Sequence, residues 1–121
     1  MKPKRAYSDY LRDILDAIEK VQAFTHSLSF DQFVNDDKTV WAVIRGLEII
    51  GEATKQLPSS LRRSYPQVPW REVAGMRDVL SHGYFGVNLK RVWQTVQDDL
   101  SPLREAVLQI LADLAGEEQA G

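Results

Sequence analysis

Hydrophobic residues recur at three- and four-residue steps along most of the chain, which is the periodicity of amphipathic α-helices. The first such stretch predicts a helix from about Asp9 to Leu28, with Ser8 as its N-cap. Its apolar stripe consists of Leu11, Ile14, Leu15, Ile18, Val21 and Phe24. Ser29 and Gln32 stand at capping-box spacing, so the link that follows is predicted to hold a helical turn.

The second predicted helix, from about Lys38 to Gln56, is apolar around most of its circumference. Its apolar positions are Val40, Val43, Ile44, Leu47, Ile49, Ile50 and Ala53. The polar surface narrows to a strip that carries Arg45, Glu48 and Glu52. A helix that is apolar on nearly every side is buried on several sides. This helix is therefore expected at the centre of a bundle or at a dimer interface, and the three charged residues in a cleft or at that interface.

Prolines, a glycine and capping residues mark the helix boundaries in the rest of the chain: Pro58, Pro66, Pro69, Gly83, Asn88 and Ser101-Pro102. They delimit a proline-broken connector before Trp70, a third helix over residues 70–83, and two further amphipathic stretches after residue 88. No segment shows the alternation expected of a strand. The sequence predicts an all-α fold, an up-down bundle of four to five helices.

The composition limits the class of protein. The 121 residues are the size of one domain, 1–121, with a tail at 116–121 that is expected to fray. The absence of cysteine excludes disulfides, thiolate catalysis and cysteine-ligated zinc, and fits a cytoplasmic location. We see no secretory signal and no apolar run long enough to cross a bilayer. Because the net charge is −2, any nucleic acid must bind at a local patch or a shaped site.

Arg77 does not fit the helix that contains it. On a helical wheel it falls inside the apolar arc of the third helix, between the directions of Trp70 and Val73. Burying an unpaired guanidinium costs several kcal/mol. Arg77 therefore either forms a structural ion pair, with Glu48 or Glu52 as possible partners, or faces a cavity where a ligand supplies negative charge.

His82 and Tyr84 follow Arg77 at the end of this helix. On an ideal helix His82 lies about 140° from Arg77, so the two side chains do not converge. A left-handed C-cap at Gly83, or a symmetric dimer, would bring such groups together. Arginine binds phosphate oxygens and histidine exchanges protons near neutral pH, so the set suits phosphate chemistry. A capping or packing role for His82 stays open.

Other basic and aromatic residues have simpler explanations. Three basic groups could flank an RNA path or belong to an ordinary solvated surface: Lys2-Lys4-Arg5, Arg62-Arg63 and Lys90-Arg91. Trp41 and Trp93 stand on apolar stripes and are assigned to the core. Trp70 is assigned to packing, with base stacking as the alternative, and His26 to the surface.

The segment RDVLSHGY, from Arg77 to Tyr84, resembles the signature of the HEPN superfamily, an arginine, a polar residue, a short spacer and a histidine. Its form, with four residues between arginine and histidine and a tyrosine two further on, is similar to that of HepT toxins. The flanking segments resemble HepT in order and spacing over nearly the whole chain: IRGLEIIGEATKQLP, YPQVPWREVAGMRDVLSHGYFGVNLKRVW and DDLSPL.

The resemblance implies a helical bundle that forms a homodimer, with two motifs at one cleft, and a metal-independent endoribonuclease that uses no cofactor. By this resemblance His82 is the general acid/base for attack of a ribose 2′-hydroxyl on the adjacent phosphate. Arg77 stabilises the charge that grows on the phosphoryl oxygens, and Asp78 orients Arg77 or His82. The product would be a 2′,3′-cyclic phosphate. RNA is the expected substrate, and no DNA or membrane partner is expected.

The resemblance to HepT also implies a partner, a minimal nucleotidyltransferase antitoxin that transfers AMP to the motif tyrosine, here Tyr84. A bulky anionic group beside the cleft would block and repel RNA. The alternative for Tyr84 is an aromatic residue that packs under the helix end. The alternative for the whole chain is a catalytically silent HEPN module that binds a nucleotide or stabilises a partner nucleotidyltransferase.

Overall fold

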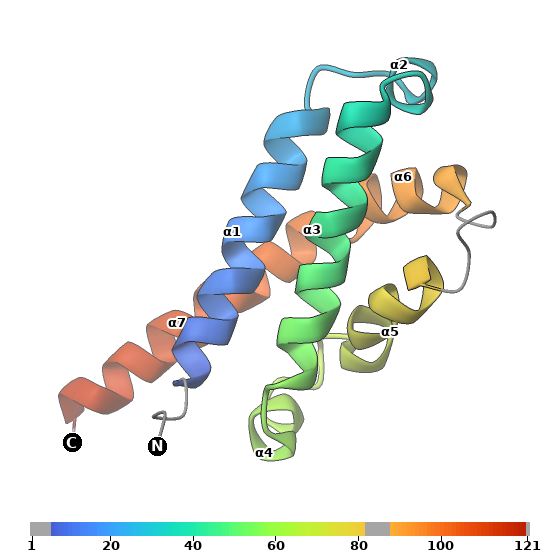
Figure 1. Ribbon diagram of the computed structural model, residues 1–121. Coiled ribbons are helices and arrows are strands. Elements are labelled where there is room, and N and C mark those ends of the chain that lie inside the picture. The colour runs from blue at the N-terminus through green and yellow to red at the C-terminus, as the bar shows by residue number, and fades with distance from the viewer. Residues whose placement is uncertain (1–5, 82–87, 121) are drawn as a thin grey trace, which may run out of the picture.

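The computed structural model describes the backbone of residues 6–81 and 88–120 and the side chains of residues 6–76 and 88–117. This part of the chain is helical, with turns between the helices (Figure 1). Its seven helices are α1 (Tyr7–Thr25), α2 (Phe30–Val34), α3 (Asp37–Lys55), α4 (Ser59–Arg63), α5 (Trp70–Ser81), α6 (Leu89–Asp98) and α7 (Leu100–Ala120). Five are long and two have five residues, which confirms the predicted all-α bundle.

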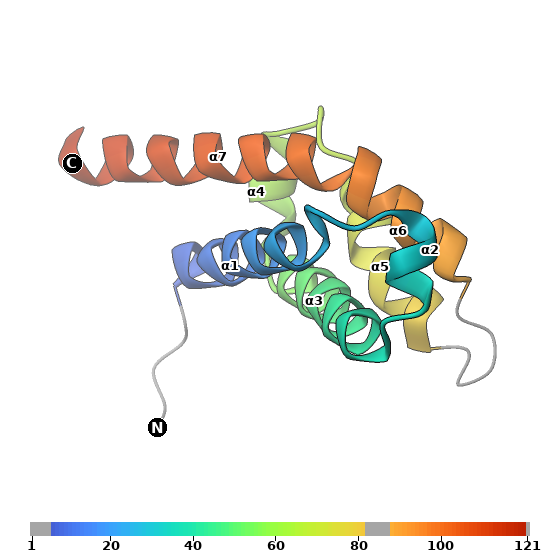
Figure 2. The same cartoon turned by 90° about the horizontal axis from the view of Figure 1, so that it is seen from above.

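Helix α3 occupies the centre of the bundle, as its apolar circumference predicts. It runs antiparallel to α1 along one flank, and α5 packs against its other flank (Figure 1). Helix α7 forms a separate layer that crosses α1 from behind and extends beyond it (Figure 2). The short helix α2 closes the end where α1 turns into α3, and α4 lies at the opposite end.

The buried core is continuous through these layers. Fully buried large side chains come from α1, α2, α3, α7 and the turn after α3: Phe33, Leu11, Ile14, Ile18, Leu47, Ile50, Leu57, Leu100 and Ile110. Phe33 of α2 contacts Trp93 of α6 with ring centroids 5.1 Å apart; Trp93, predicted in the core, is half-buried and packs against it. The prediction for Trp41 was wrong, because its side chain is 73% exposed.

A glycine sets the spacing of the two central helices. Gly46 of α3 lies against Val21 of α1, and a Cβ atom added at Gly46 would overlap the Val21 side chain. The missing side chain therefore lets the backbones of α1 and α3 approach closely.

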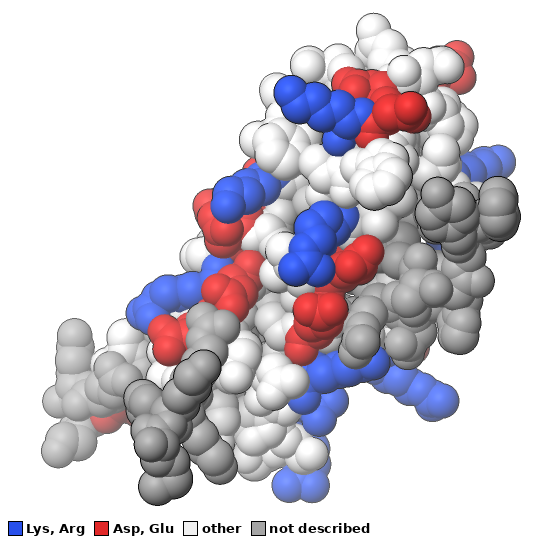
Figure 3. Space-filling view, viewed as in Figure 1, with Lys and Arg blue, Asp and Glu red and all other residues white. Residues whose placement is uncertain are grey.

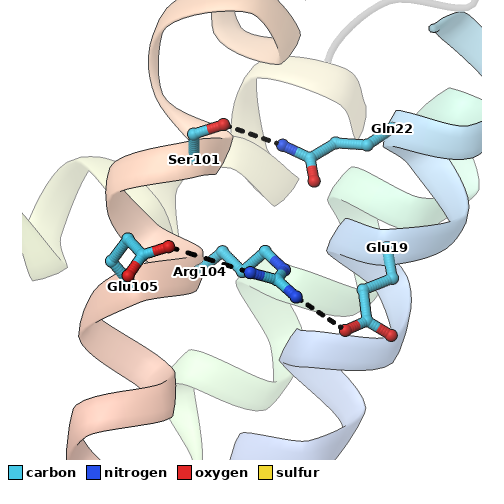
Figure 4. Close-up of polar contacts among 5 residues, drawn as sticks. All are labelled: Glu19, Gln22, Ser101, Arg104 and Glu105. Carbon is cyan, nitrogen blue, oxygen red and sulfur yellow. Dashed lines mark hydrogen bonds and ion pairs between the residues drawn. The ribbon is translucent and has the colours of Figure 1, made fainter.

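Two polar contacts join α7 to α1 (Figure 4). The guanidinium of Arg104 lies 3.4 Å from the Glu19 carboxylate, and the Gln22 amide donates a hydrogen bond of 3.1 Å to the Ser101 hydroxyl. These contacts are exposed, so they orient α7 more than they stabilise it.

Two of the three predicted N-caps are confirmed. The Ser29 hydroxyl accepts a hydrogen bond from the Gln32 backbone, and the Gln32 side chain accepts one from the Ser29 backbone, which is a complete capping box for α2. The Asn88 side chain accepts from the Arg91 backbone at the start of α6. The first prediction was wrong, since α1 begins at Tyr7, before Ser8.

The connector before α5 is more ordered than its prolines indicate. It contains α4 and then a turn in which the Tyr65 carbonyl accepts hydrogen bonds from the Val68 backbone and from Trp70 Nε1. Trp70 is only 8% exposed, so its predicted packing role is confirmed. The turn leads directly into α5, and the buried Trp70 fixes the position of the first turn of this helix.

Two other expectations concern the ends of the chain and the membrane. Helix α7 continues to Ala120, and the division into one domain with a fraying tail stays a prediction. No helix within residues 6–81 and 88–120 is long and apolar enough to span a bilayer.

Candidate functional site

Helix α5 carries the first half of the predicted motif. Trp70 and Val73 are buried, and Met76 packs against the core, so the first two turns of α5 are fixed. The backbone continues as helix through Arg77 and Asp78 to Ser81. The motif therefore begins two turns into α5, after the N-terminal part of the helix that packs against the core.

The chemistry-bearing groups of the motif lie outside the described residues. This holds for the side chains of Arg77 and Asp78 and for His82, Gly83 and Tyr84 as a whole. The turn at Gly83, the ion pair of Arg77 with Glu48 or Glu52, and the roles assigned to the five motif residues stay predictions.

On α3, the predicted charged strip contains an ion pair. Arg45 Nη1 lies 3.4 Å from Glu48 Oε2, with the two side chains 62% and 33% exposed. Glu48 therefore neutralises Arg45. A pair this exposed contributes about 0–1 kcal/mol.

The strip borders a groove of about 890 Å³ between α1 and α3. Arg45 and Glu52 line it from α3, and Phe24, Lys20 and Asp16 from α1. Lys20 and Asp16 form an ion pair of 2.8 Å. Figure 3 shows this face, with positive and negative side chains alternating over both helices. A groove that combines charges of both signs with apolar groups is better suited to bind another protein surface than to bind the phosphate backbone of RNA.

Trp41 extends this strip at the end near α2. Trp41, Arg45, Glu48 and Glu52 stand at spacings of four, three and four residues, so they share one face of α3. The sequence carried this signal, but the hydrophobicity of tryptophan favoured a core assignment. An exposed tryptophan beside a groove is a candidate contact residue.

A second cavity of about 460 Å³ lies between α5, α6 and α7. Its walls are mostly apolar, with Val73 and Met76 from α5 and Leu103 from α7. Glu72, Asp99 and Arg91 also line the cavity, so its charged groups are net negative and repel a phosphate. This cavity is therefore a poor site for an RNA backbone.

Within the described part of the chain, no group of three or more histidine, cysteine, aspartate or glutamate residues is placed to hold a metal ion.

Comparison with known proteins decides the family. The sequence model of the family described as ribonuclease HepT-like matches residues 14–110, which include the whole motif. This chain belongs to the HepT-like ribonuclease family. The membership confirms the predicted family and the predicted class of enzyme, a ribonuclease.

Several HepT-like relatives cover most of the chain. A protein of Thermococcus cleftensis named “Probable ribonuclease HepT” is 50% identical over 101 residues, which are 84% of this chain and 92% of the relative. A “Putative RNase” of Methanocaldococcus jannaschii is 38% identical over 117 residues, 97% of each chain. Another “Putative RNase”, of Caldanaerobacter subterraneus, is 44% identical over 102 residues, 84% of this chain and 91% of the relative. No solved structure matches the chain.

Proposed function

We propose that this chain is a metal-independent endoribonuclease toxin that is neutralised by a nucleotidyltransferase antitoxin. The supporting observation is the family match over residues 14–110, because this range contains Arg77, Asp78, His82 and Tyr84 at the spacing of the motif. The substrate is RNA, and its own 2′-hydroxyl is the nucleophile.

His82 moves the proton in this reaction. Neutral imidazole accepts the proton of the 2′-hydroxyl while that oxygen attacks the adjacent phosphorus, and the bond from phosphorus to the 5′-oxygen breaks. A proton passes to the leaving 5′-oxygen, so the products are a 2′,3′-cyclic phosphate and a 5′-hydroxyl. Arg77 stabilises the charge on the phosphoryl oxygens, and Asp78 orients Arg77 or His82.

We also propose that the active form is a homodimer whose two motifs share one cleft. The exposed face of α3 supports this proposal, because it combines the 73% exposed Trp41 with the groove that Arg45 and Glu52 line. Aromatic residues and arginine are enriched at protein interfaces, and alternating charges can pair across a two-fold axis.

Regulation through Tyr84 completes the proposal. The antitoxin would transfer AMP from ATP to the Tyr84 hydroxyl, with release of pyrophosphate. The bound AMP would place a bulky negative group beside the cleft and repel the RNA phosphates. Intact mass after incubation with the partner and ATP measures this transfer, and AMP addition that persists in Tyr84→Phe would place the site elsewhere.

Cleavage of RNA in EDTA tests the proposed reaction. Loss of general acid/base catalysis is expected to slow His82→Ala by about 10²- to 10⁴-fold. The chain has two histidines, and the exposed His26 provides the matched control, His26→Ala, which should retain wild-type activity. Thermal melting verifies that both variants fold. Unchanged cleavage by folded His82→Ala would remove the assignment, and cleavage that needs added Mg²⁺ would contradict the metal-independent mechanism.

A further inference from the structure

The basic residues of this protein fall into two groups. One group pairs with carboxylates: Arg12 with Asp9, Lys20 with Asp16, Arg45 with Glu48, and Arg104 with Glu19 and Glu105. Arg62, Arg63 and Arg71, in contrast, form no ion pair with any acidic residue in the described part of the chain, and the same holds for Lys38 on α3 and for Lys90 and Arg91 on α6.

These three arginines lie at one end of the bundle. Arg62 and Arg63 form the last turn of α4, and Arg71 is in the first turn of α5. The turn that joins the two helices is held by the bond from Trp70 Nε1 to the Tyr65 carbonyl. Figure 3 shows positive side chains gathered at this end of the molecule, over α4 and the end of α3. We call Arg62, Arg63 and Arg71 the α4 basic end.

Local structure accounts for only part of this arrangement. Arg62 and Arg63 are favourable at the C-terminus of α4, where the helix dipole is negative. Arg71 lies at the N-terminus of α5, where the helix dipole is positive and disfavours a cation. Glu72, the acidic residue in the same turn, offsets this repulsion. Arg62 Nε is buried and has no hydrogen-bond partner among the described residues. Three guanidinium groups without acidic partners attract an external anion.

Helix α5 connects this end of the bundle to the motif. Arg77 lies six positions after Arg71, which corresponds to about 9 Å along the helix axis. A strand of RNA whose scissile phosphate lies at the motif would therefore place phosphates a few nucleotides away beside α4. Arginine suits this contact because its planar group donates two parallel hydrogen bonds to a phosphate.

We propose that the α4 basic end binds the phosphate backbone of the substrate at a distance from the scissile bond, so that the enzyme acts on RNA several nucleotides long in preference to dinucleotides. This inference rests on the proposed ribonuclease function for its substrate, but RNA binding at this end can be measured without cleavage. The contact is electrostatic and carries no base preference.

A charge-matched pair of triple variants tests the proposal. The test variant is Arg62→Gln/Arg63→Gln/Arg71→Gln, and the control is Arg12→Gln/Lys20→Gln/Arg104→Gln, which removes the same charge from paired residues. Both are made in the His82→Ala chain, and binding of a fluorescent 20-nucleotide RNA is followed by anisotropy at several salt concentrations. For the test variant only, we expect the affinity for RNA to fall by about tenfold or more. The slope of log affinity against log salt concentration should also become smaller by about two.

Cleavage by chains with His82 intact provides the second readout. The test substitutions should raise KM for the long RNA and leave kcat/KM for a dinucleotide unchanged. If the test variant binds RNA with the affinity and salt slope of the control, the proposal is overturned while the nuclease assignment stands. The proposal is also overturned if the test variant still binds RNA but no longer binds a poly-glutamate probe. That result would assign the α4 basic end to the binding of an acidic protein. If the wild type binds RNA through this end but never cleaves it, the proposed catalytic function fails and the binding inference stands.

Discussion

The Tyr65 hydroxyl donates a hydrogen bond of 2.6 Å to the Asp113 carboxylate, and this bond joins the turn before α5 to the second half of α7. Gln109 donates to the other carboxylate oxygen at 2.8 Å. The bond raises the pKa of Tyr65 to about 12, with burial as a further cause, and lowers the pKa of Asp113. The contact is therefore strongest when the phenol is protonated and the carboxyl is ionised.

Tyr65→Phe should destabilise the protein most near neutral pH. The Tyr65 contribution is fully present below the ordinary tyrosine pKa of about 10 and is lost as the pH rises through about 12. The Asp113 contribution is present above the ordinary carboxyl pKa and is lost as the pH falls through its lowered value. Urea unfolding across this pH range measures the difference. Tyr7→Phe, at a half-exposed tyrosine, is the control, and a Tyr65→Phe effect that does not depend on pH would contradict the prediction.

Gly46→Ala should lower the free energy of unfolding by about 1–3 kcal/mol, because the new Cβ overlaps Val21. Valine in a helix has essentially one rotamer, so α1 and α3 must separate to admit the methyl group. Gly116→Ala in α7 meets no atom within 4 Å and should instead stabilise by up to about 1 kcal/mol. Chemical denaturation compares the two. Combining Gly46→Ala with Val21→Ala should recover part of the loss, and no recovery would mean that the strain lies elsewhere.

Phe33→Ala should destabilise the protein by about 3–5 kcal/mol, since Phe33 is fully buried and contacts Trp93. Phe24→Ala removes an equal volume from a side chain that is 47% exposed and should have a much smaller effect. Thermal and urea unfolding measure both variants. Equal losses would contradict the role of α2 as a core element.

Trp41→Glu should weaken the proposed dimer without loss of fold. A central aromatic residue at an interface contributes about 2 kcal/mol or more, so the dimer dissociation constant should rise by at least about 30-fold. Leu108→Glu on α7, at a residue that is 36% exposed, is the control surface substitution. Sedimentation gives the dissociation constants. An unchanged dimer in Trp41→Glu would exclude this face of α3.

Much of the fold follows from sequence patterns because most helices carry local signals. The capping box of Ser29 and Gln32 and the cap at Asn88 depend on residues three positions apart, so the sequence shows them directly. The central position of α3 followed from its apolar circumference. The exposure of Trp41 could not follow in this way, because it depends on which faces α1 and α5 cover.

The candidate site likewise has one part that the sequence shows directly and one part that depends on how the helices pack. The motif from Arg77 to Tyr84 is contiguous, so a resemblance could find it and the family match includes it. The α4 basic end is assembled from two helices, and the sequence offered no reason to join Arg71 to Arg62 and Arg63. Helix α4 was itself missed, since the helix lies between prolines and has no apolar stripe.

Helix α4 has no fully buried residue, and of its five residues Leu61 alone is a hydrophobic side chain that packs against the core. Substitutions of its exposed residues therefore leave the hydrophobic core intact and change no residue of the motif, which begins at Arg77. In evolution, the surface residues of such a helix can change without loss of the fold. A lineage could alter which RNAs its enzyme captures by exchanging a few exposed residues of α4, with the cleavage chemistry inherited unchanged.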